Sequence, residues 1–413
     1  MQYYIDPGTG SMLFTVLIGV LSAAVYGLRN SFVKLRFYLH GGKGAAVSEE
    51  RPAFAIFSDD KRYWNIFKPI CDEFEKRGTK LVYMTSSPDD PALSENYDCI
   101  DCTFIGKGNQ GFARLNRLKA DIVLSTTPSL DVFYWKRSKD VKWYTHIAHA
   151  PSDLTMYRMF GIDYYDAILV SGDYQEKQIR DLEKVRHLPG KEIVKTGMSY
   201  LDTMKARLDQ LPPLEDHQTT VLLAPSWGPS SILNKYGGDM IDALLRTGYH
   251  IIIRPHPQSF TSEKEMLDRL MEQYPGSEQL EWNQDNDNFE VLHRSDIMIS
   301  DFSGVMFDFS LVFDKPVIYT DVEFDSSPYD ACWLEEEPWT FRVLPKIGTQ
   351  LTRASLSDIK SVIDTCLQDP RFEKGREEAR LETWAYPGEG AVRATEYLIN
   401  KHAELQEKPD TAE

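Results

Sequence analysis

Four short polar stretches follow apolar, strand-like runs and hold most of the side chains that could do chemistry. They are "HIAHAPSD" (146–153), "PSWGPSS" (225–231), "PHPQS" (255–259) and "SDFSG" (300–304). Because the carboxyl ends of parallel strands meet at one edge of a sheet, we expect these stretches to line a cleft. Histidine, arginine, serine and free backbone amides are groups that bind phosphate and move protons.

The stretch "SDFSG" lies between strand-like "DIMIS" and helix-like "VMFDFSLVF". Ser303 and Gly304 therefore fall at a predicted helix N-terminus, where unpaired amides and the helix dipole favour an anion. Gly304 lets the backbone approach closely, and Ser303 adds a hydroxyl donor. The alternative is a simple helix cap formed by Asp301 or Ser303. Phosphate binding is favoured because Ser226 and His256 are predicted on the same rim.

His256 lies between two prolines, which stiffen the backbone on both sides. Beside Arg254, a rigid imidazole could neutralise a phosphate or donate a proton to a departing phosphate oxygen. Ser259 closes the same stretch and is a weaker candidate for the donor site. The alternative for His256 is a capping or packing role.

His149 is the candidate proton acceptor from the facing domain, since it closes the strand-like run "KWYTHIA". His146 lies three residues earlier, on the expected strand itself, and is a weaker candidate. Asp153 is a further candidate from the same stretch. A structural role is the alternative for all three.

Strand-like and helix-like segments alternate through two units of similar size, which predicts an α/β fold with parallel sheets. The first unit has seven strand-like runs, "AFAIFS", "KLVYMTS", "DCTFIG", "ADIVLST", "KWYTHIA", "DAILVS" and "EIVKTG". The second has four, "TTVLLAPS", "YHIIIRPHP", "SDIMIS" and "KPVIYT". We expect a linker at 31–52, a Rossmann-like acceptor domain at 53–210 and a Rossmann-like donor domain at 219–385. A C-terminal helix is expected at 386–405 and a tail at 406–413. The proline-containing run "DQLPPLEDHQ" marks the domain boundary. Two doubly wound domains facing one cleft are the predicted architecture.

The N-terminal segment 1–30 is predicted to be a membrane anchor. Residues 11–28 are free of charge and long enough to cross a bilayer as a helix. Basic residues follow the span, which predicts a single-pass protein of the cytoplasmic (inner) membrane with its catalytic part in the cytoplasm. The alternative is a buried helix of a soluble domain.

Composition excludes several classes of protein. The formal charge of −17 disfavours nucleic acid as a partner. Five cysteines, with a single CxxC at Cys99 and Cys102, do not form a zinc ribbon or a disulfide framework. No metal ligands are predicted, no motif requires a cofactor, and a divalent cation such as Mg²⁺ stays open. "GKGNQG" (106–111) follows the third strand instead of the first, so we interpret it as a glycine turn and not as a dinucleotide site.

The arrangement of "APSW", "RPHP" and "SDFSGVMFDFSLVFDKPVIY" resembles the CDP-glycerol glycerophosphotransferase family, which includes teichoic-acid primases and polymerases. The matching positions in the last stretch are Asp301, Ser303, Asp308, Phe309, Lys315 and Pro316. The resemblance extends over residues 54–401. Ala148 and Ala150 depart from the tryptophan and glycine that flank the family's first histidine, and Gly304 replaces a small hydroxyl residue.

The resemblance implies a GT-B fold and transfer of glycerol phosphate, or a similar polyol phosphate, from a CDP-activated donor to a hydroxyl acceptor, with release of CMP. His149 and His256 match the family's two important histidines. A membrane-linked acceptor and a role in cell-surface polymer synthesis are implied as well. Two alternatives stay open: a GT-B nucleotide-sugar glycosyltransferase or epimerase, and a non-catalytic membrane scaffold of the same fold.

Overall fold

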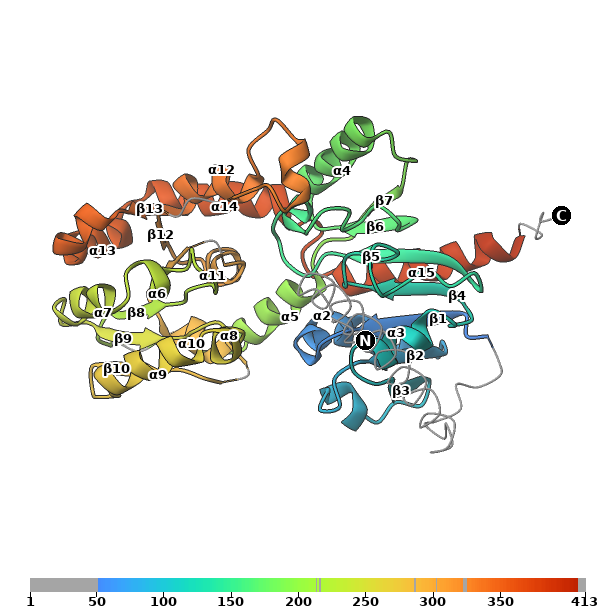
Figure 1. The fold of residues 1–413 in the computed structure, drawn as a ribbon, viewed down its shortest axis with the longest axis horizontal. Coiled ribbons are helices and arrows are strands. Elements are labelled where there is room, and N and C mark those ends of the chain that lie inside the picture. The colour runs from blue at the N-terminus through green and yellow to red at the C-terminus, as the bar shows by residue number, and fades with distance from the viewer. Residues whose placement is uncertain are drawn as a thin grey trace, which may run out of the picture. The chain divides into compact units, whose positions relative to one another are not determined.

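The computed structural model describes residues 51–212, 214, 217–285, 287–301, 303–321 and 325–407. Residues 1–50 lie outside this description, and residues 51–413 form one compact unit. Within that compact unit, two parallel sheets are each flanked by helices (Figure 1). We refer to them as the first and second lobes.

The first lobe holds a seven-stranded sheet in the order β3-β2-β1-β4-β5-β6-β7. All its neighbouring strands are parallel. Strands β1 and β4 are fully buried, as expected for a sheet covered on both faces. The strands are β1 (Phe54–Ser58), β2 (Leu81–Thr85), β3 (Ile100–Phe104), β4 (Ala120–Ser125), β5 (Val141–Ile147), β6 (Ala167–Val170) and β7 (Glu192–Lys195).

The second lobe holds a six-stranded parallel sheet in the order β10-β9-β8-β11-β12-β13. In each sheet the strand order reverses direction around the first strand, β1 or β8, as in a doubly wound fold. The strands are β8 (Thr220–Leu223), β9 (His250–Ile253), β10 (Leu280–Trp282), β11 (Ile297–Ser300), β12 (Val317–Thr320) and β13 (Gly348–Leu351).

Helices connect the strands on both faces of each sheet (Figure 1). The first lobe has η1 (Lys61–Tyr63), α2 (Trp64–Lys76), η2 (Pro91–Ser94), α3 (Asn109–Leu115), η3 (Leu154–Met156), α4 (Asp173–Arg186) and α5 (Ser199–Leu208). The second has α6 (Ile232–Lys235), α7 (Gly238–Leu245), α8 (Ser259–Ser262), α9 (Lys264–Gln273), α10 (Phe289–Arg294), α11 (Val305–Val312), η4 (Asp330–Trp333), α12 (Trp339–Ile347), η5 (Arg353–Asp358), α13 (Ile359–Gln368) and α14 (Arg371–Thr383).

The last helix, α15 (Gly390–Glu407), returns to the first lobe and packs on α2, β4 and α5. The chain before it crosses closely over the loops after β6 and β7. A Cβ at Gly197, where φ is +82°, would lie 2.1 Å from the Ala385 carbonyl oxygen. Glycine at 197 is therefore required twice, by its backbone angle and by this crossing.

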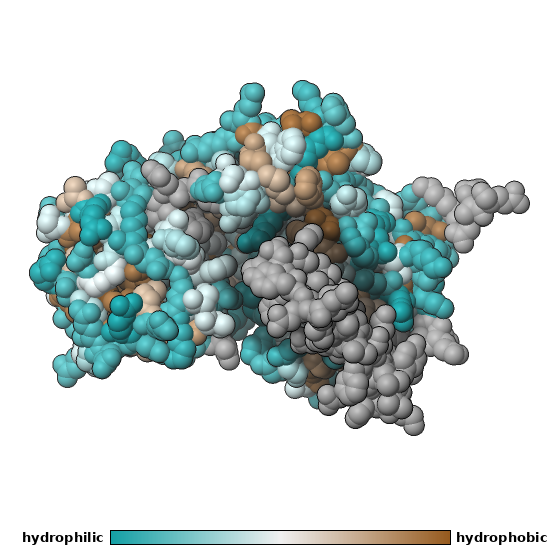
Figure 2. Space-filling view, in the orientation of Figure 1, coloured by the Kyte–Doolittle hydropathy of each residue, from teal (hydrophilic) through white to brown (hydrophobic). Residues whose placement is uncertain are grey.

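The expected α/β GT-B-like architecture with two parallel sheets is confirmed, and eleven predicted strands match β1–β9, β11 and β12. The edge strands β10 and β13 were not predicted. Among the described residues, no helix is long and apolar enough to cross a membrane. The expected anchor at 11–28 lies outside the described residues and stays a prediction. The face drawn in Figure 2 is mainly hydrophilic, with small apolar patches.

Candidate active site

The carboxyl ends of β8 and β11 lie side by side, at the point where the strand order of the second sheet reverses. Asp301 follows β11, is 3% exposed, and accepts hydrogen bonds from the Ser226 amide (3.0 Å) and the Ile232 amide (3.1 Å). Its carboxylate therefore holds the 225–231 loop in place. Ser226 is buried too, and its Oγ has no partner within the described part of the chain. An unpaired buried hydroxyl at this position suits an incoming ligand oxygen.

Ser303 and Gly304 lead into α11, as predicted, and both are half-buried. Gly304 is the N-cap residue, with helical backbone angles and no side chain capping the helix. The first helical turn therefore keeps an anion-binding character. Phe302, between Asp301 and Ser303, lies outside the described residues.

Arg254 and His256 follow β9, at the same edge of the sheet. The Arg254 guanidinium donates to Asn283 Oδ1 and, at 2.7 Å, to the Asp285 carbonyl. The imidazole Nδ1 of His256 accepts from the Gln258 amide at 3.1 Å, which leaves Nε2 for a ligand. Burial, and then the Arg62 charge, lower the pKa of His256 to about 4. Ser259 is buried and begins the short helix α8.

In the first lobe, the Tyr157 hydroxyl lies between two imidazoles. It is 2.9 Å from His149 Nδ1 and 3.3 Å from His146 Nε2. His146 is on β5, fully buried, and its Nδ1 has no partner among the described residues. Burial lowers the pKa of His146 to about 3. It lowers that of His149 to about 4, partly offset by a hydrogen bond with the Thr126 backbone. Both rings are therefore neutral near pH 7.

Asp153 has a structural position instead of the catalytic one considered from sequence. Its carboxylate is buried and accepts from the amides of Trp339 (2.7 Å) and Thr340 (2.8 Å), the first residues of α12. Gln178 donates to it as well. Asp153 thus caps a helix that begins 186 residues later, which makes it unsuited to accept a proton from a substrate.

The two lobes meet beside the predicted residues. A Cβ built on Gly304 would lie 3.7 Å from the Ala150 Cβ, which is ordinary contact. Ala150 directly follows His149, so the start of α11 lies next to the first-lobe histidine. The Arg62 charge also lowers the pKa of both His149 and His256. Of the residues that the sequence assigned to one cleft, the structure places the His149 stretch beside Gly304.

Sequence reasoning missed several polar residues of the first lobe. Asp59 follows β1 and accepts from the Thr127 hydroxyl at 2.9 Å, and burial raises its pKa. Arg62 and Tyr63 come three and four residues later, and the Tyr63 ring is 5.3 Å from His149. The rule that ligands bind beyond strand ends could have found these three. Tyr157 had no comparable signal, because it lies in a loop.

Two family positions in the α11 region have structural roles. Lys315 Nζ donates to the carbonyls of His293 (2.5 Å) and Ser295 (2.5 Å) at the end of α10. Asp308 accepts from the Tyr200 hydroxyl of α5, which joins the two lobes, and burial raises its pKa to about 7. These contacts hold α11 and the strand after it in place.

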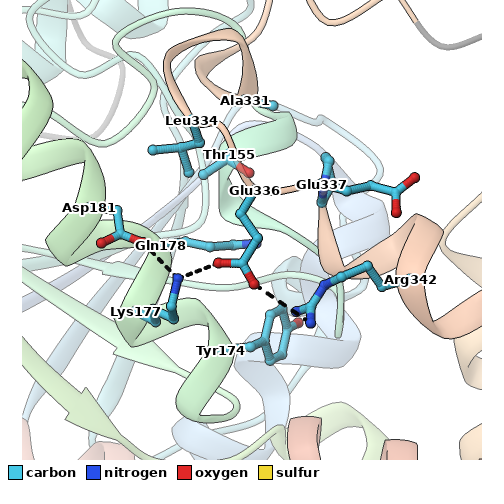
Figure 3. A pocket seen from close by; sticks show the side chains of 11 residues that line it. Thr155, Tyr174, Lys177, Gln178, Asp181, Ala331, Leu334, Glu336, Glu337 and Arg342 are labelled. Carbon is cyan, nitrogen blue, oxygen red and sulfur yellow. Dashed lines mark hydrogen bonds and ion pairs between the residues drawn. The ribbon is translucent and has the colours of Figure 1, made fainter.

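A small cavity between α4 and the 331–342 segment is lined by charged side chains (Figure 3). Lys177 pairs with Asp181 and Glu336, and Glu336 also pairs with Arg342 at 3.6 Å. None of the sequence-predicted site residues lines it. Both of its basic side chains, Lys177 and Arg342, are paired with carboxylates, so we assign it no ligand.

The remaining sequence interpretations concern glycines and cysteines. Gly106 and Gly108 both have positive φ, in a tight turn after β3 at the edge of the sheet, away from the point where a dinucleotide would bind. Cys99 and Cys102 are free thiols. No cluster of metal-ligating side chains occurs in the part of the chain that the structure describes.

A protein-family model matches the middle part of the chain. Residues 159–331 match the model of the CDP-Glycerol:Poly(glycerophosphate) glycerophosphotransferase family, as the sequence resemblance predicted. No curated protein matches the chain.

Solved structures share the fold at low sequence identity. A variant of the wall teichoic acid polymerase TagF with CDPG has 15% identity and a TM-score of 0.54, covering 93% of this chain and 99% of that one. A putative UDP-N-acetylglucosamine 2-epimerase from Listeria monocytogenes has 12% identity and a TM-score of 0.53, covering 87% and 98%. UDP-GlcNAc 2-epimerase from Neisseria meningitidis bound to UDP-GlcNAc has 13% identity and a TM-score of 0.51, covering 84% of this chain and 99% of that one.

Proposed function

We propose that the chain is a CDP-glycerol glycerophosphotransferase-like transferase, which moves glycerol phosphate, or a similar polyol phosphate, from a CDP-activated donor to a hydroxyl acceptor. The match of residues 159–331 to this family's model supports the proposal. CMP is the leaving group. The reaction belongs to the synthesis of a cell-surface polymer. The acceptor is linked to the membrane, and the reaction occurs at its cytoplasmic face.

The donor binds in the second lobe. Its phosphates lie against the first turn of α11, where Ser303 and the Gly304 amide donate hydrogen bonds. The unpaired Ser226 hydroxyl and the Nε2 side of His256 line the same rim. Arg254 supports the rim through its contact with the Asp285 carbonyl, and its charge favours a dianionic donor. These groups also stabilise the charge that develops on departing CMP.

In the transfer step, the acceptor oxygen attacks the phosphorus that carries the polyol. The bond from that phosphorus to the CMP oxygen breaks, and CMP leaves with the electron pair. His149 takes the acceptor's proton on the ring nitrogen opposite Tyr157. The hydrogen bond from its Nδ1–H to the Tyr157 hydroxyl, 2.9 Å away, stabilises the imidazolium that forms. Phosphoryl transfer depends chiefly on positioning and charge stabilisation, so this proton transfer is a smaller contribution.

The observation that carries the proposal is the position of His149 and Ala150 against the N-terminus of α11 within a chain that matches this family. A donor phosphate at α11 would then lie beside a first-lobe histidine. The likeness to the 2-epimerases keeps a nucleotide-sugar enzyme as the second candidate, since that fold is shared at a TM-score above 0.5.

The test is to incubate the purified full-length protein with CDP-glycerol, other CDP-alcohols, UDP-GlcNAc and UDP-glucose, each with a membrane fraction as acceptor. We expect CMP release in the reactions that contain a CDP-alcohol, and no turnover of the UDP-sugars. Turnover of a UDP-sugar without CMP release would favour the second candidate. Donor binding without any turnover across several acceptors would favour a non-catalytic scaffold.

A further inference from the structure

One region of the first lobe has a charge opposite to that of the chain as a whole. Between residues 112 and 140 there are six Lys and Arg residues against three Asp residues, in a chain of net charge −17. One of these, Asp121, is buried and paired with Arg51 and Lys142. Among the described residues, no carboxylate pairs with Arg117, Lys119 or Lys139. The region therefore presents uncompensated positive charge.

Two large apolar side chains are exposed in the same region. Phe133 is 61% exposed and Tyr134 is 71% exposed. The next residue, Trp135, is buried against Phe57, with ring centroids 5.0 Å apart. An anchored Trp135 thus fixes the loop so that the two preceding aromatic rings face outward.

This loop is tied to the helix α3 segment, so the region is a preformed surface. Asn116 makes both ties, donating to the Tyr134 carbonyl at 3.1 Å and accepting from the Lys136 amide at 2.8 Å. Farther along, the Ser138 hydroxyl donates to the Leu118 carbonyl at 2.7 Å. The Phe112 and Tyr134 rings stack at 6.5 Å. The aromatic-basic surface comprises Arg117, Lys119, Phe133, Tyr134, Lys136 and Lys139.

We propose that the aromatic-basic surface binds the headgroup region of a bilayer that contains anionic lipids. Aromatic rings are favoured at the depth of the headgroups, and flanking Lys and Arg are attracted to anionic lipid. The exposed aromatic pair favours a membrane interface over nucleic acid, because a chain of net charge −17 disfavours a partner bound by charge alone. The surface belongs to the lobe that begins at Phe54, closest in sequence to the predicted anchor at 11–28. It would hold that lobe, expected to bind the acceptor, against the membrane.

The test uses the full-length protein in nanodiscs of phosphatidylcholine alone, or of phosphatidylcholine with about one quarter phosphatidylglycerol. Hydrogen–deuterium exchange is measured for peptides covering 112–120 and 131–140. We expect exchange in these peptides to be at least about threefold slower in the anionic discs than in the discs of phosphatidylcholine alone. The double variants Phe133→Ser with Tyr134→Ser, and Lys119→Glu with Lys139→Glu, should lose this protection. The matched control Lys264→Glu with Lys374→Glu, which alters exposed lysines of the second lobe, should keep it.

Equal exchange in both kinds of disc would overturn the proposal, as would loss of protection in the control variant. The same protection from soluble polyphosphate in detergent would overturn it too, and would identify a polyanion site. Protection that accompanies dimer formation in light scattering would assign the surface to a second copy of the chain. CMP release from CDP-glycerol in detergent, measured in parallel, separates these outcomes from failure of the proposed reaction, because neither double variant alters the active site.

Discussion

The two halves of the candidate site are built in opposite ways. In the first lobe, His146 and His149 lie in an aromatic environment and share one hydroxyl partner, Tyr157. In the second lobe, the buried carboxylate of Asp301 and the Arg254 guanidinium are used to hold loops, so that hydroxyls and backbone amides are left to meet the ligand. In the proposed reaction, the first arrangement sets the protonation of the reacting histidine, and the second sets the shape of the donor-binding surface. Substitutions should therefore affect turnover in one lobe and donor affinity in the other.

The largest expected effect comes from the two histidines. His149→Ala should lower turnover by ~10²–10⁴-fold, the range for loss of a general base, while donor affinity stays near that of the wild type. His256→Ala should weaken donor binding. Calorimetry with CDP-glycerol and CMP release at saturating acceptor would separate the two. If His149→Ala weakened donor binding and left turnover intact, the contrast between the lobes would be wrong.

Substitution of Asp301 tests whether its buried carboxylate supports the donor-binding loop 225–231 of the second lobe. Asp301→Ala should leave the buried amides of Ser226 and Ile232 without an acceptor and lower the free energy of unfolding by about 2–4 kcal/mol. Donor affinity should fall with it, because the 225–231 loop loses its support. Urea unfolding and calorimetry measure the two quantities. Asp301→Asn keeps one acceptor oxygen, so its stability and donor affinity should lie between those of the wild type and Asp301→Ala. An equal loss of donor affinity in both variants would point to a direct role of the charge.

His146 tests the first lobe through pH. Its pKa is about 3 in the folded protein and about 6.5 when unfolded, so the unfolded chain binds the proton first as the pH falls. The stability it contributes is fully present above pH 6.5 and is lost between about pH 6.5 and 3. When the pH is lowered from 7 to 4.5, the free energy of unfolding should therefore fall by about 2 kcal/mol less in His146→Leu than in the wild type. Urea unfolding at both pH values measures this, and an equal fall in the two proteins would contradict it.

Tyr157→Phe should have a moderate effect on the same lobe. A hydrogen bond that involves a charged group is stronger than a neutral one, so losing the hydroxyl disfavours the imidazolium of His149 more than the neutral ring. The pKa of His149 should fall below its value of about 4, and turnover should fall about tenfold with unchanged donor affinity. The acidic limb of the pH–turnover profile reports the pKa. A wild-type profile and rate would mean that Tyr157 has only a packing role.

The smallest effect concerns the contact between the lobes. Gly304 has an ordinary helical φ, and an added Cβ would meet Ala150 at 3.7 Å without strain. Gly304→Ala should therefore change donor affinity by no more than about threefold, whereas Gly304→Val should crowd Ala150 and weaken binding further. Ser303→Ala, which removes a donor, should weaken binding without changing stability. Equal affinity in all three variants would exclude phosphate at this turn.

The long, apolar strands could be predicted because the same pattern that makes them buried also marks them in the sequence. "HIII" and "IMIS" need no neighbour to be recognised as strands. The edge strands "LEW" and "GTQL" were missed because they are short and only partly buried, so that pairing with a neighbour is what makes them strands. The positions of His149, His256 and Ser303 followed from a rule about strand ends.

The roles of the carboxylates could not be predicted. Asp301 and Asp153 follow strands as catalytic carboxylates do, yet each binds backbone amides that are 75 and 186 residues distant in sequence. Local pattern carries no information about such partners. A buried carboxylate needs hydrogen-bond donors wherever the fold provides them, and only the three-dimensional arrangement shows whether those donors belong to protein or to ligand.

The return of α15 to the first lobe has a consequence for synthesis of the chain. His402 of this helix lies 5.1 Å from the Phe54 ring, measured between centroids, and the Tyr397 hydroxyl accepts from the Trp143 indole at 3.2 Å. The strands of the first lobe are synthesised before those of the second lobe, but α15, which covers part of the first lobe, is synthesised after both sheets. The second lobe can complete its sheet sooner, so the half that is translated first should mature last. Until α15 has been synthesised, the face of α2 that it covers stays open to chaperones and proteases.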